Sequence, residues 1–322
     1  MSDNKQMNLG DAVATLVRDG DCLAVGGFVT NRRPYALVRE VIRRQRRGLY
    51  IEGGPSGGDI DMLIGAGCVE AIMISYIANS GYTAVGRRFR EAVESGTLLF
   101  EDFSLDVQTA AYHAAALGVS FAPLANMLGS DLERVWGISR EERAKHPKLP
   151  REKLVVLEDP FNPGKRVCCI PAPKIDVALL HVQTASPDGT CRLEGASFQD
   201  IDIAMAAGRT IVSCENLVSN EEIRREPEKN SLTGLCVDAV VHAPYGAHPS
   251  QCLGHYDYDP VIYTEYDKAS RTQEEFDAFI GKYVTDCPTH EAYLDRVGAS
   301  ALLRLRVKPG VGYVPGIKNN KS

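Results

Sequence analysis

Two glycines and an aromatic residue follow the first strongly apolar run of this chain. Residues 23–25 lead into Gly26, Gly27 and Phe28, and Pro34 then opens an amphipathic segment. A strand, a glycine turn and a helix in this order can present bare backbone N–H groups at the end of a sheet, where they would hold an anion or a carbonyl oxygen. A tight turn that only uses the backbone freedom of glycine is the alternative.

Three further glycine-bearing loops follow predicted strands, at residues 53–58, 79–81 and 244–249. Because the carboxyl ends of parallel strands meet at one edge of a sheet, we expect the four loops to share a ligand-binding edge. Glycines that simply mark turns explain each loop equally well on its own. The Gly-x-Gly-x-x-Gly fingerprint is absent from the first loop, and no Gly-Lys-Ser/Thr follows any loop. A nucleotide-dependent dehydrogenase and a P-loop enzyme are therefore disfavoured.

The candidate nucleophiles in the sequence are one serine and several carboxylates. Residues 54–58 match Gly-x-Ser-x-Gly, the nucleophile elbow of serine α/β-hydrolases. Only one or two strands precede Ser56, however, and Pro55 removes an N–H group from the turn. Carboxylates near the loops and strands are further candidates: Glu52, Asp59, Asp61, Glu101 and Asp102. None has a distinctive motif, and Asp59 would serve equally well as a helix cap.

Histidine, cysteine and aspartate gather after the last predicted strand. They are His248, Cys252, His255, Asp257 and Asp259. The spacing His-x-x-x-Cys-x-x-His is not that of a standard zinc site, so we expect no metal. His181 ends an apolar strand, where a hydrogen-bonded core histidine is expected more often than a catalytic one.

Composition narrows the class of protein. The 322 residues carry a net charge of −6, which argues against a polyanion-binding role. The arginines within residues 43–47 lie at the end of a predicted helix, so nucleic-acid binding is not expected. Nine cysteines without a Cys-x-x-Cys pair indicate a reducing compartment. Residues 1–10 lack the apolar region of a signal peptide, and the longest uncharged run, 107–130, contains polar and proline residues. We expect a cytoplasmic protein without a membrane span.

Strand and helix patterns alternate along the chain. Strands are predicted at 22–28, 49–52, 71–77, 97–100, 121–124, 167–170, 176–182, 209–214 and 237–242. Helices are predicted at 35–47, 59–65, 85–94, 105–117, 139–145 and within 272–295. This alternation predicts an α/β fold with a mostly parallel sheet and helices on both faces. We expect a single domain, residues 1–322, with an excursion rich in proline and charge near 129–163.

Several longer motifs of the chain resemble those of a known family. Residues 19–28, followed by Pro34, are similar to the N-terminal signature of family I coenzyme A transferases. Segments 57–65, 78–81, 185–190, 221–225, 236–241, 243–252 and 256–259 resemble the α (A) subunit of glutaconate CoA-transferase. Arg32 replaces a glycine of the general signature, as in the glutaconate-type branch. The resemblance implies the CoA-transferase (NagB/RpiA-like) fold.

The resemblance implies that this chain is one half of an enzyme. The catalytic glutamate of the family lies in a Ser-Glu-Asn-Gly motif of the β (B) subunit, which is absent here; residues 213–216 are only the nearest string, and Glu215 is not assigned the role. No catalytic residue is therefore expected in this chain. A separate β subunit would supply the nucleophile, in a hetero-oligomer of αβ pairs. Coenzyme A thioesters would be substrates, with no permanently bound cofactor and no metal.

An acyl-substrate role is implied for the loop residues. The candidate substrate-binding residues are Gly26, Gly27, Phe28, Thr30, Arg32, Arg33, Gly53, Gly54, Ser80 and Gly81. Ser80 and Thr30 would hydrogen-bond the acyl group. Arg32 or Arg33 would clamp the second carboxylate of a dicarboxylate such as glutaconate, because guanidinium binds carboxylate in a fork. A surface salt bridge is the alternative for both arginines.

Three other functions stay open from the sequence. One half of a ring-opening acyl-CoA hydrolase would share the fold and use water in place of an acceptor acid. A non-catalytic binding subunit would need no partner, and a serine hydrolase would use Ser56. The donor and acceptor acids are not fixed by the residues.

Overall fold

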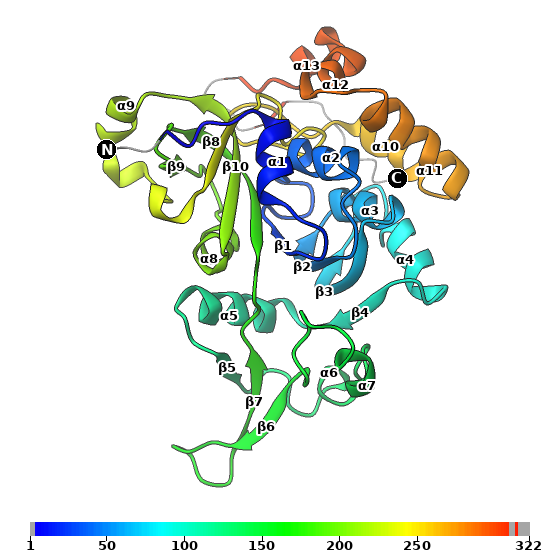
Figure 1. The fold of residues 1–322 in the computed structure, drawn as a ribbon, viewed down its shortest axis with the longest axis vertical. Helices are drawn as coiled ribbons and strands as arrows, with labels where there is room; N and C mark the ends of the chain where they lie inside the picture. Colours follow the sequence, from blue (N-terminus) through cyan, green and yellow to red (C-terminus); the bar gives the residue numbers. More distant parts are fainter. Residues whose placement is uncertain (1–3, 309–312, 315–322) are drawn as a thin grey trace.

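Within residues 4–308 and 313–314, which the computed structural model describes, seven parallel strands form the main sheet. Their order is β11-β10-β8-β1-β2-β3-β4 (Figure 1). They are β1 Cys22–Val25, β2 Leu49–Ser56, β3 Val69–Ile77, β4 Leu99–Asp102, β8 Val177–Ala185, β10 Arg209–Leu217 and β11 Ala239–His242. A short β9, Cys191–Arg192, runs antiparallel to β8. The predicted α/β fold with a mostly parallel sheet is confirmed.

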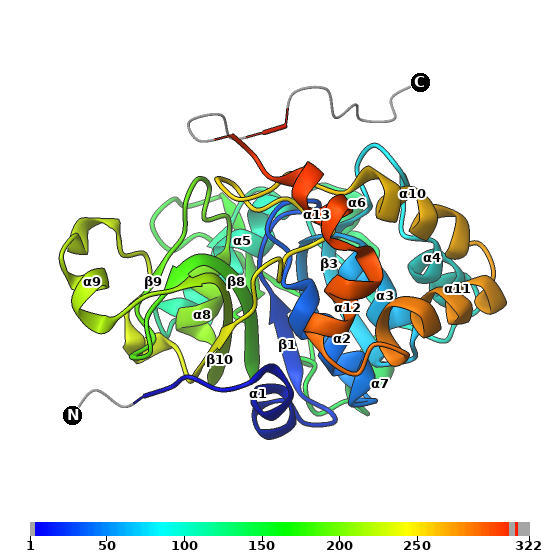
Figure 2. The same ribbon diagram turned by 90° about the horizontal axis from the view of Figure 1, so that it is seen from above.

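Helices cover both faces of this sheet (Figure 2). One face packs against α1 Leu9–Leu16, α2 Tyr35–Arg43, α3 Gly58–Gly65, α4 Arg87–Glu94, α10 Pro260–Ala269, α11 Gln273–Ile280 and α12 His290–Val297. The other packs against α5 Leu105–Ala116 and α8 Asp200–Ala206. Neighbouring residues of β1 alternate between the faces: Leu23 joins the first core and Ala24 the second. Every residue of β8 is buried, as expected for a strand covered on both sides.

Several elements differ from their predicted extents. Helix α2 ends at Arg43, not at residue 47, because Gln45 (φ 52°) and Gly48 (φ 63°) adopt left-handed backbone and turn the chain into β2. The predicted segment 272–295 is α11, a π-helical turn Gly281–Thr285 (η3) and α12. Among the helices that were not predicted are α1, α8, α9 Asn220–Arg224, α10, α13 Ala299–Leu305 and the short helices η1 Pro227–Lys229 and η2 Gly234–Cys236.

A small lobe lies below the sheet in Figure 1. It contains an antiparallel sheet of order β5-β7-β6, with β5 Phe121–Leu124, β6 Val155–Glu158 and β7 Arg166–Pro171, and the short helices α6 Asp131–Arg134 and α7 Arg140–Arg143. Ser139 caps α7: its hydroxyl accepts a hydrogen bond from the Glu142 N–H. The prediction that 121–124 belongs to the parallel sheet is wrong. That strand pairs with β7, and only Ala122 in it is buried.

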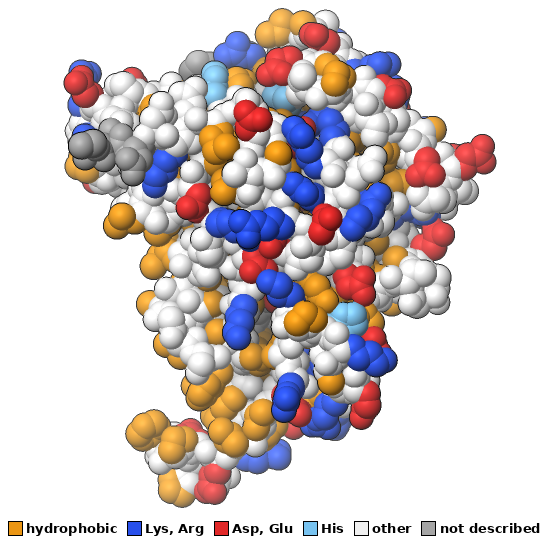
Figure 3. All heavy atoms as spheres, in the orientation of Figure 1, with side chains coloured by type: hydrophobic (Ala, Val, Ile, Leu, Met, Phe, Trp, Pro, Cys, Tyr) orange, Lys and Arg blue, Asp and Glu red, His pale blue; other side chains and the backbone are white. Residues whose placement is uncertain are grey.

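The predicted excursion 129–163 is thus the middle of this lobe. Hydrophobic side chains lie on the surface at the far end of the lobe (Figure 3). The exposed hydrophobic residues of the lobe include Phe121, Val155, Leu157 and Phe161. Whether residues 1–322 form one domain stays a prediction. In the described part of the chain, no helix has the length and apolar character needed to cross a membrane.

Candidate functional site

The four glycine-bearing segments singled out in the sequence lie together at the carboxyl edge of the sheet. The first meets the second, since the Val29 N–H donates to the Pro55 carbonyl (2.8 Å). The second meets the third, since the Gly58 N–H donates to Oδ1 of Asn79 (2.7 Å). The first also meets the fourth, since the Ala36 N–H donates to the Gly246 carbonyl (2.8 Å). The edge is therefore one continuous hydrogen-bonded structure.

The glycine turn after β1 does not present bare N–H groups, and that expectation is corrected. The Gly26 N–H donates to the Leu179 carbonyl (2.9 Å), and the Gly27 N–H to Oδ1 of Asp200 (2.8 Å). A Cβ on Gly26 would lie 2.5 Å from the Leu180 side chain. Gly27 has a φ of 81°, in the left-handed region that favours glycine. These glycines are needed because β8 and Asp200 approach the turn closely.

The second glycine segment is part of strand β2 and not a loop after it. Gly53 and Gly54 lie within β2, and a Cβ on Gly54 would lie 2.1 Å from Oε1 of Gln199. Ser56, the last residue of β2, is fully buried, and its hydroxyl has no hydrogen-bond partner. A nucleophilic serine needs a neighbouring base and access to substrate. Ser56 lacks both in this structure.

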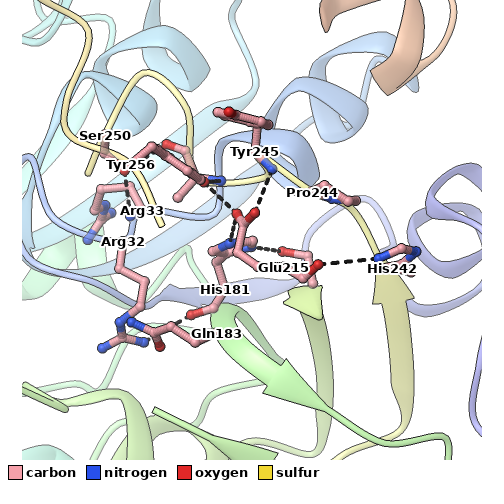
Figure 4. A network of polar contacts seen from close by, with 12 residues as sticks. Arg32, Arg33, His181, Gln183, Glu215, His242, Pro244, Tyr245, Ser250 and Tyr256 are labelled. Atoms are coloured by element: carbon pink, nitrogen blue, oxygen red, sulfur yellow. Dashed lines mark hydrogen bonds and ion pairs between the residues drawn. The ribbon is translucent and has the colours of Figure 1, made fainter. Parts of the chain in front are cut away.

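Both candidate arginines, labelled in Figure 4, are buried, and each is paired with an aspartate. Nη1 of Arg32 lies 2.6 Å from Oδ2 of Asp200 and donates to the His181 carbonyl (2.9 Å). Nε of Arg33 donates to Oδ2 of Asp59 (2.8 Å). Arg32 is 3% exposed and Arg33 is 0% exposed, so the salt bridges offered as the alternative to a clamp exist but are buried and not on the surface. The carboxylate of Asp59 therefore holds an arginine.

Four of the ten candidate residues remain accessible. Phe28 and Thr30 are half-buried, and Ser80 and Gly81 are exposed. The Phe28 ring stacks on Phe198, with ring centroids 4.8 Å apart. The Ser80 hydroxyl lies 3.2 Å from the Tyr76 hydroxyl at the end of β3. The other six candidate residues are buried.

A pocket of about 190 Å³ opens beside the turn after β1. It is lined by Asn31, Arg32, Gln183, Glu194, Ala196, Phe198, Gln251 and Leu253. Left-handed backbone at non-glycine residues occurs around it, at Val29 (φ 52°), Arg32 (φ 50°) and Phe198 (φ 49°). Such conformations cost about 1–3 kcal/mol each and often mark functional sites. For the β-branched Val29 the conformation is a clear outlier.

A buried network that sequence reasoning missed lies behind this pocket (Figure 4). Nε2 of His181 lies 2.7 Å from Oε1 of Glu215, and the Tyr256 hydroxyl donates to the same oxygen (2.5 Å). The Tyr245 N–H donates to Oε2 (2.8 Å). Burial alone would raise the pKa of Glu215, but the hydrogen bond and charge of His181, with the bond from Tyr256, bring that pKa below its ordinary value. The network ties the segment after β11 to β8 and β10.

The histidine–cysteine cluster of the sequence is divided in the structure. Nε2 of His248 lies 3.0 Å from Oδ2 of Asp259, so this histidine is held by a carboxylate, while burial lowers its pKa below the ordinary value. Cys252 lies instead beside His181 and Glu215, with their possible ligand atoms within 4.8 Å of one another. Burial raises the pKa of the Cys252 thiol well above its ordinary value. A metal would need the thiolate, so this donor set does not favour one.

Comparison with known proteins then decides the family. The model of the coenzyme A transferase family, described as "Coenzyme A transferase", matches residues 6–243. The chain belongs to the coenzyme A transferase family. The matched residues include all the strands of the main sheet and the glycine-bearing segments 26–28, 53–58 and 79–81.

Individual members of the family are also similar to this chain. The A subunit of glutaconate CoA-transferase from Acidaminococcus fermentans is 53% identical over 310 residues, 96% of this chain and 97% of that protein. A crystal structure of that organism's glutaconate coenzyme A-transferase matches with a TM-score of 0.95, over 96% of this chain and 98% of that one. The A subunit of 3-oxoadipate CoA-transferase from Pseudomonas knackmussii is 31% identical over 281 residues, covering 86% and 93%. The chain is one subunit of a CoA-transferase, and its family acts on CoA thioesters.

Proposed function

We propose that this CoA-transferase chain is the α (A) subunit of an enzyme that moves CoA between an acyl-CoA and a small carboxylate or dicarboxylate of the glutaconate type. The observation that carries the proposal is the 53% identity to the A subunit of glutaconate CoA-transferase along 96% of the chain. A β subunit of related fold supplies the nucleophilic glutamate. The αβ pairs assemble into a larger hetero-oligomer in the cytoplasm.

The reaction that we infer proceeds by exchange at the partner's glutamate. Its carboxylate attacks the thioester carbonyl and the C–S bond breaks. CoA departs as the thiolate, and the glutamate is now part of an acyl-glutamyl anhydride. The thiolate then attacks the glutamyl carbonyl, which releases the first carboxylate and forms an enzyme–CoA thioester. An incoming carboxylate reverses both steps. Covalent catalysis of this kind divides one difficult transfer into easier ones.

In this proposal the present chain forms the acyl-substrate wall of an intersubunit cleft. The exposed Ser80 and the half-buried Thr30 would hydrogen-bond the acyl group, and Phe28 would pack against it. The buried pairs Arg32–Asp200 and Arg33–Asp59 hold the turn that carries Phe28 and Thr30. Because both arginines are buried in ion pairs, we assign them a positioning role and not the direct clamp.

The test is to express this chain with the product of a neighbouring β-subunit gene and to measure CoA exchange between acetyl-CoA and glutaconate. The pair should transfer CoA, and each chain alone should be inactive. Ser80→Ala should lower kcat/KM about fivefold, in line with the loss of one hydrogen bond of about 1 kcal/mol. Ser95→Ala is the matched control, since Ser95 is exposed at the end of α4.

Each alternative gives a different result. Release of free CoA without an acceptor acid would indicate a hydrolase. A stable chain that needs no partner for acyl-CoA binding would indicate a separate binding subunit. Activity of this chain alone that depends on Ser56 would indicate a serine hydrolase, and would overturn the proposal.

A further inference from the structure

A small cavity, of about 20 Å³, lies between α2 and the C-terminal helices α10, α11 and α12. None of the ten candidate substrate-binding residues lines it. Arg39 is the one charged side chain among the described residues of its lining. The polar residues beside it are five tyrosines: Tyr35, Tyr263, Tyr266, Tyr283 and Tyr293. A water-sized group needs about 10–15 Å³ of such space, so the cavity has room for a single atom or ion of that size.

The guanidinium of Arg39 is buried, with the residue only 2% exposed. Nη1 donates to the His248 carbonyl (3.0 Å), and Cζ lies 3.6 Å from the centroid of the Tyr293 ring. Nε and Nη2 are also buried, and neither has a hydrogen-bond partner among the described residues. Buried N–H donors are normally satisfied, because an unmade hydrogen bond costs about 1–3 kcal/mol. Two nitrogens of this side chain therefore need an acceptor.

Arg39 differs from the other buried arginines in the described part of the chain. Each of those lies against a carboxylate: Arg32 on Asp200, Arg33 on Asp59, Arg88 on Glu91 and Arg143 on Glu101. Among the described residues, Arg39 has no carboxylate within ion-pair distance. Burial of a charge without a counter-charge is costly, so an arginine of this kind calls for an anion.

The carboxylates near Arg39 are engaged by other groups. Glu40, the next residue of α2, pairs with Arg43 and Arg44. Asp259 lies 3.0 Å from Nε2 of His248 and accepts a hydrogen bond from the Val261 N–H (2.8 Å) at the start of α10. These contacts direct both carboxylates away from the guanidinium of Arg39, so the chain itself leaves that charge without a direct partner.

The titratable groups around Arg39 agree with an excess of positive charge. Burial lowers the pKa of Arg39 to about 10, so the guanidinium stays charged at neutral pH. Burial lowers the pKa of His248 and of His290, the latter to about 4, and the charge of Arg39 lowers both further. A water molecule would satisfy the N–H groups but would not neutralise the charge. An anion would do both.

We propose that this cavity binds one monatomic anion of the chloride class, which accepts hydrogen bonds from Nε and Nη2 of Arg39. The size of the cavity selects a single ion over phosphate or a carboxylate. The tyrosine rings suit such an ion, because the edges of aromatic rings carry partial positive charge. The ion joins α2, which follows the first glycine turn, to the C-terminal helices. The inference does not depend on the acids that the enzyme uses.

The first test is thermal unfolding of the assembled complex in sodium chloride or sodium bromide, with sodium gluconate at equal ionic strength as the reference. Gluconate is too large for the cavity. Each halide should raise Tm along a saturating curve, by about 4 °C when its concentration is a hundredfold above Kd. The same Tm in chloride and gluconate would overturn the proposal.

Two substitutions separate this site from general salt effects. Arg39→Met removes the charge and keeps a long unbranched side chain, so the halide-dependent rise in Tm should disappear. Arg88→Met is the matched control, since Arg88 is also buried but lies against Glu91. That variant should keep the full rise, whatever its own Tm. A halide-dependent rise that persists in Arg39→Met would contradict the assignment.

A bromide-soaked crystal of the complex locates the ion without any variant. Anomalous scattering should show a bromide peak beside Nε and Nη2 of Arg39. An ordered water there without anomalous signal would overturn the proposal even if Arg39→Met does not fold. None of these measurements uses transfer activity, so a failure here is distinguishable from a failure of the proposed function.

Discussion

Nε2 of His181, on β8, lies 2.7 Å from Oε1 of Glu215, on the neighbouring strand β10. Both side chains are buried at the carboxyl edge of the sheet. Arg32 donates to the His181 carbonyl, and Tyr245 donates to the Glu215 carboxylate. The pair thus joins the turn after β1 to the segment after β11, and it fixes the positions of loops that are distant in the sequence.

Glu215→Gln should destabilise the protein by about 1.5–3 kcal/mol at pH 7. The Tyr256 hydroxyl and the Tyr245 N–H both donate to the carboxylate, so an amide NH₂ at either oxygen position would face a donor. Urea unfolding measures the change, with the exposed Glu274→Gln as control. An unchanged unfolding midpoint would show that the network does not stabilise the fold.

The same glutamate should contribute to acid lability. Its folded-state pKa lies below the ordinary value of 4.5, so the stabilisation is present above that value and is lost as pH falls through the folded pKa. The difference in unfolding free energy between wild type and Glu215→Gln should therefore shrink below about pH 4.5. A difference that stays constant down to pH 3 would contradict the low pKa.

Arg33→Met should cost about 3–5 kcal/mol, because it leaves the buried carboxylate of Asp59 without its cation. Arg87→Met removes a partly exposed pair with Asp267 and should cost no more than about 1 kcal/mol. Thermal and urea unfolding give both values. A higher KM for a dicarboxylate than for a monocarboxylate, with stability unchanged, would instead favour the substrate clamp.

Gly57→Ala should destabilise by about 1–3 kcal/mol, because the new Cβ would lie 2.2 Å from the Val29 carbonyl oxygen. Gly281 offers a matched comparison. It has helical backbone and open space around its Cβ position, so Gly281→Ala should be neutral or stabilise by up to about 1 kcal/mol. Equal effects of the two substitutions on the unfolding free energy would contradict the close packing at Gly57.

The nine cysteines should react very unequally with a chromogenic disulfide reagent. All are free in the structure, eight are buried, and only Cys236 is half-exposed. Burial also raises the pKa of Cys68 to about 11 and that of Cys214 to about 12, which lowers their thiolate content. One thiol should react quickly in the native protein and nine after denaturation. Fast reaction of several thiols would show that the core opens readily.

Local sequence was sufficient for most of the main sheet. Continuous apolar runs such as that of β8 and the glycine or proline at their ends predicted the parallel strands, because a strand buried on both faces needs apolar residues throughout. The same reasoning misplaced β5. A strand of four residues carries no signal about its partner, and its pairing with β7 depends on residues nearly fifty positions away.

Some features of the candidate site follow from the sequence, and others depend on tertiary contacts. The sequence by itself determined the family, the glycine-bearing segments and their common edge, because each depends on residue type and order. Only the tertiary structure decided that Arg32 and Arg33 are buried in ion pairs, that the first glycine turn has no free N–H groups, and that Glu215 meets His181. The three side-chain pairs join residues from 26 to 168 positions apart, and no local pattern specifies which carboxylate will neutralise a buried cation.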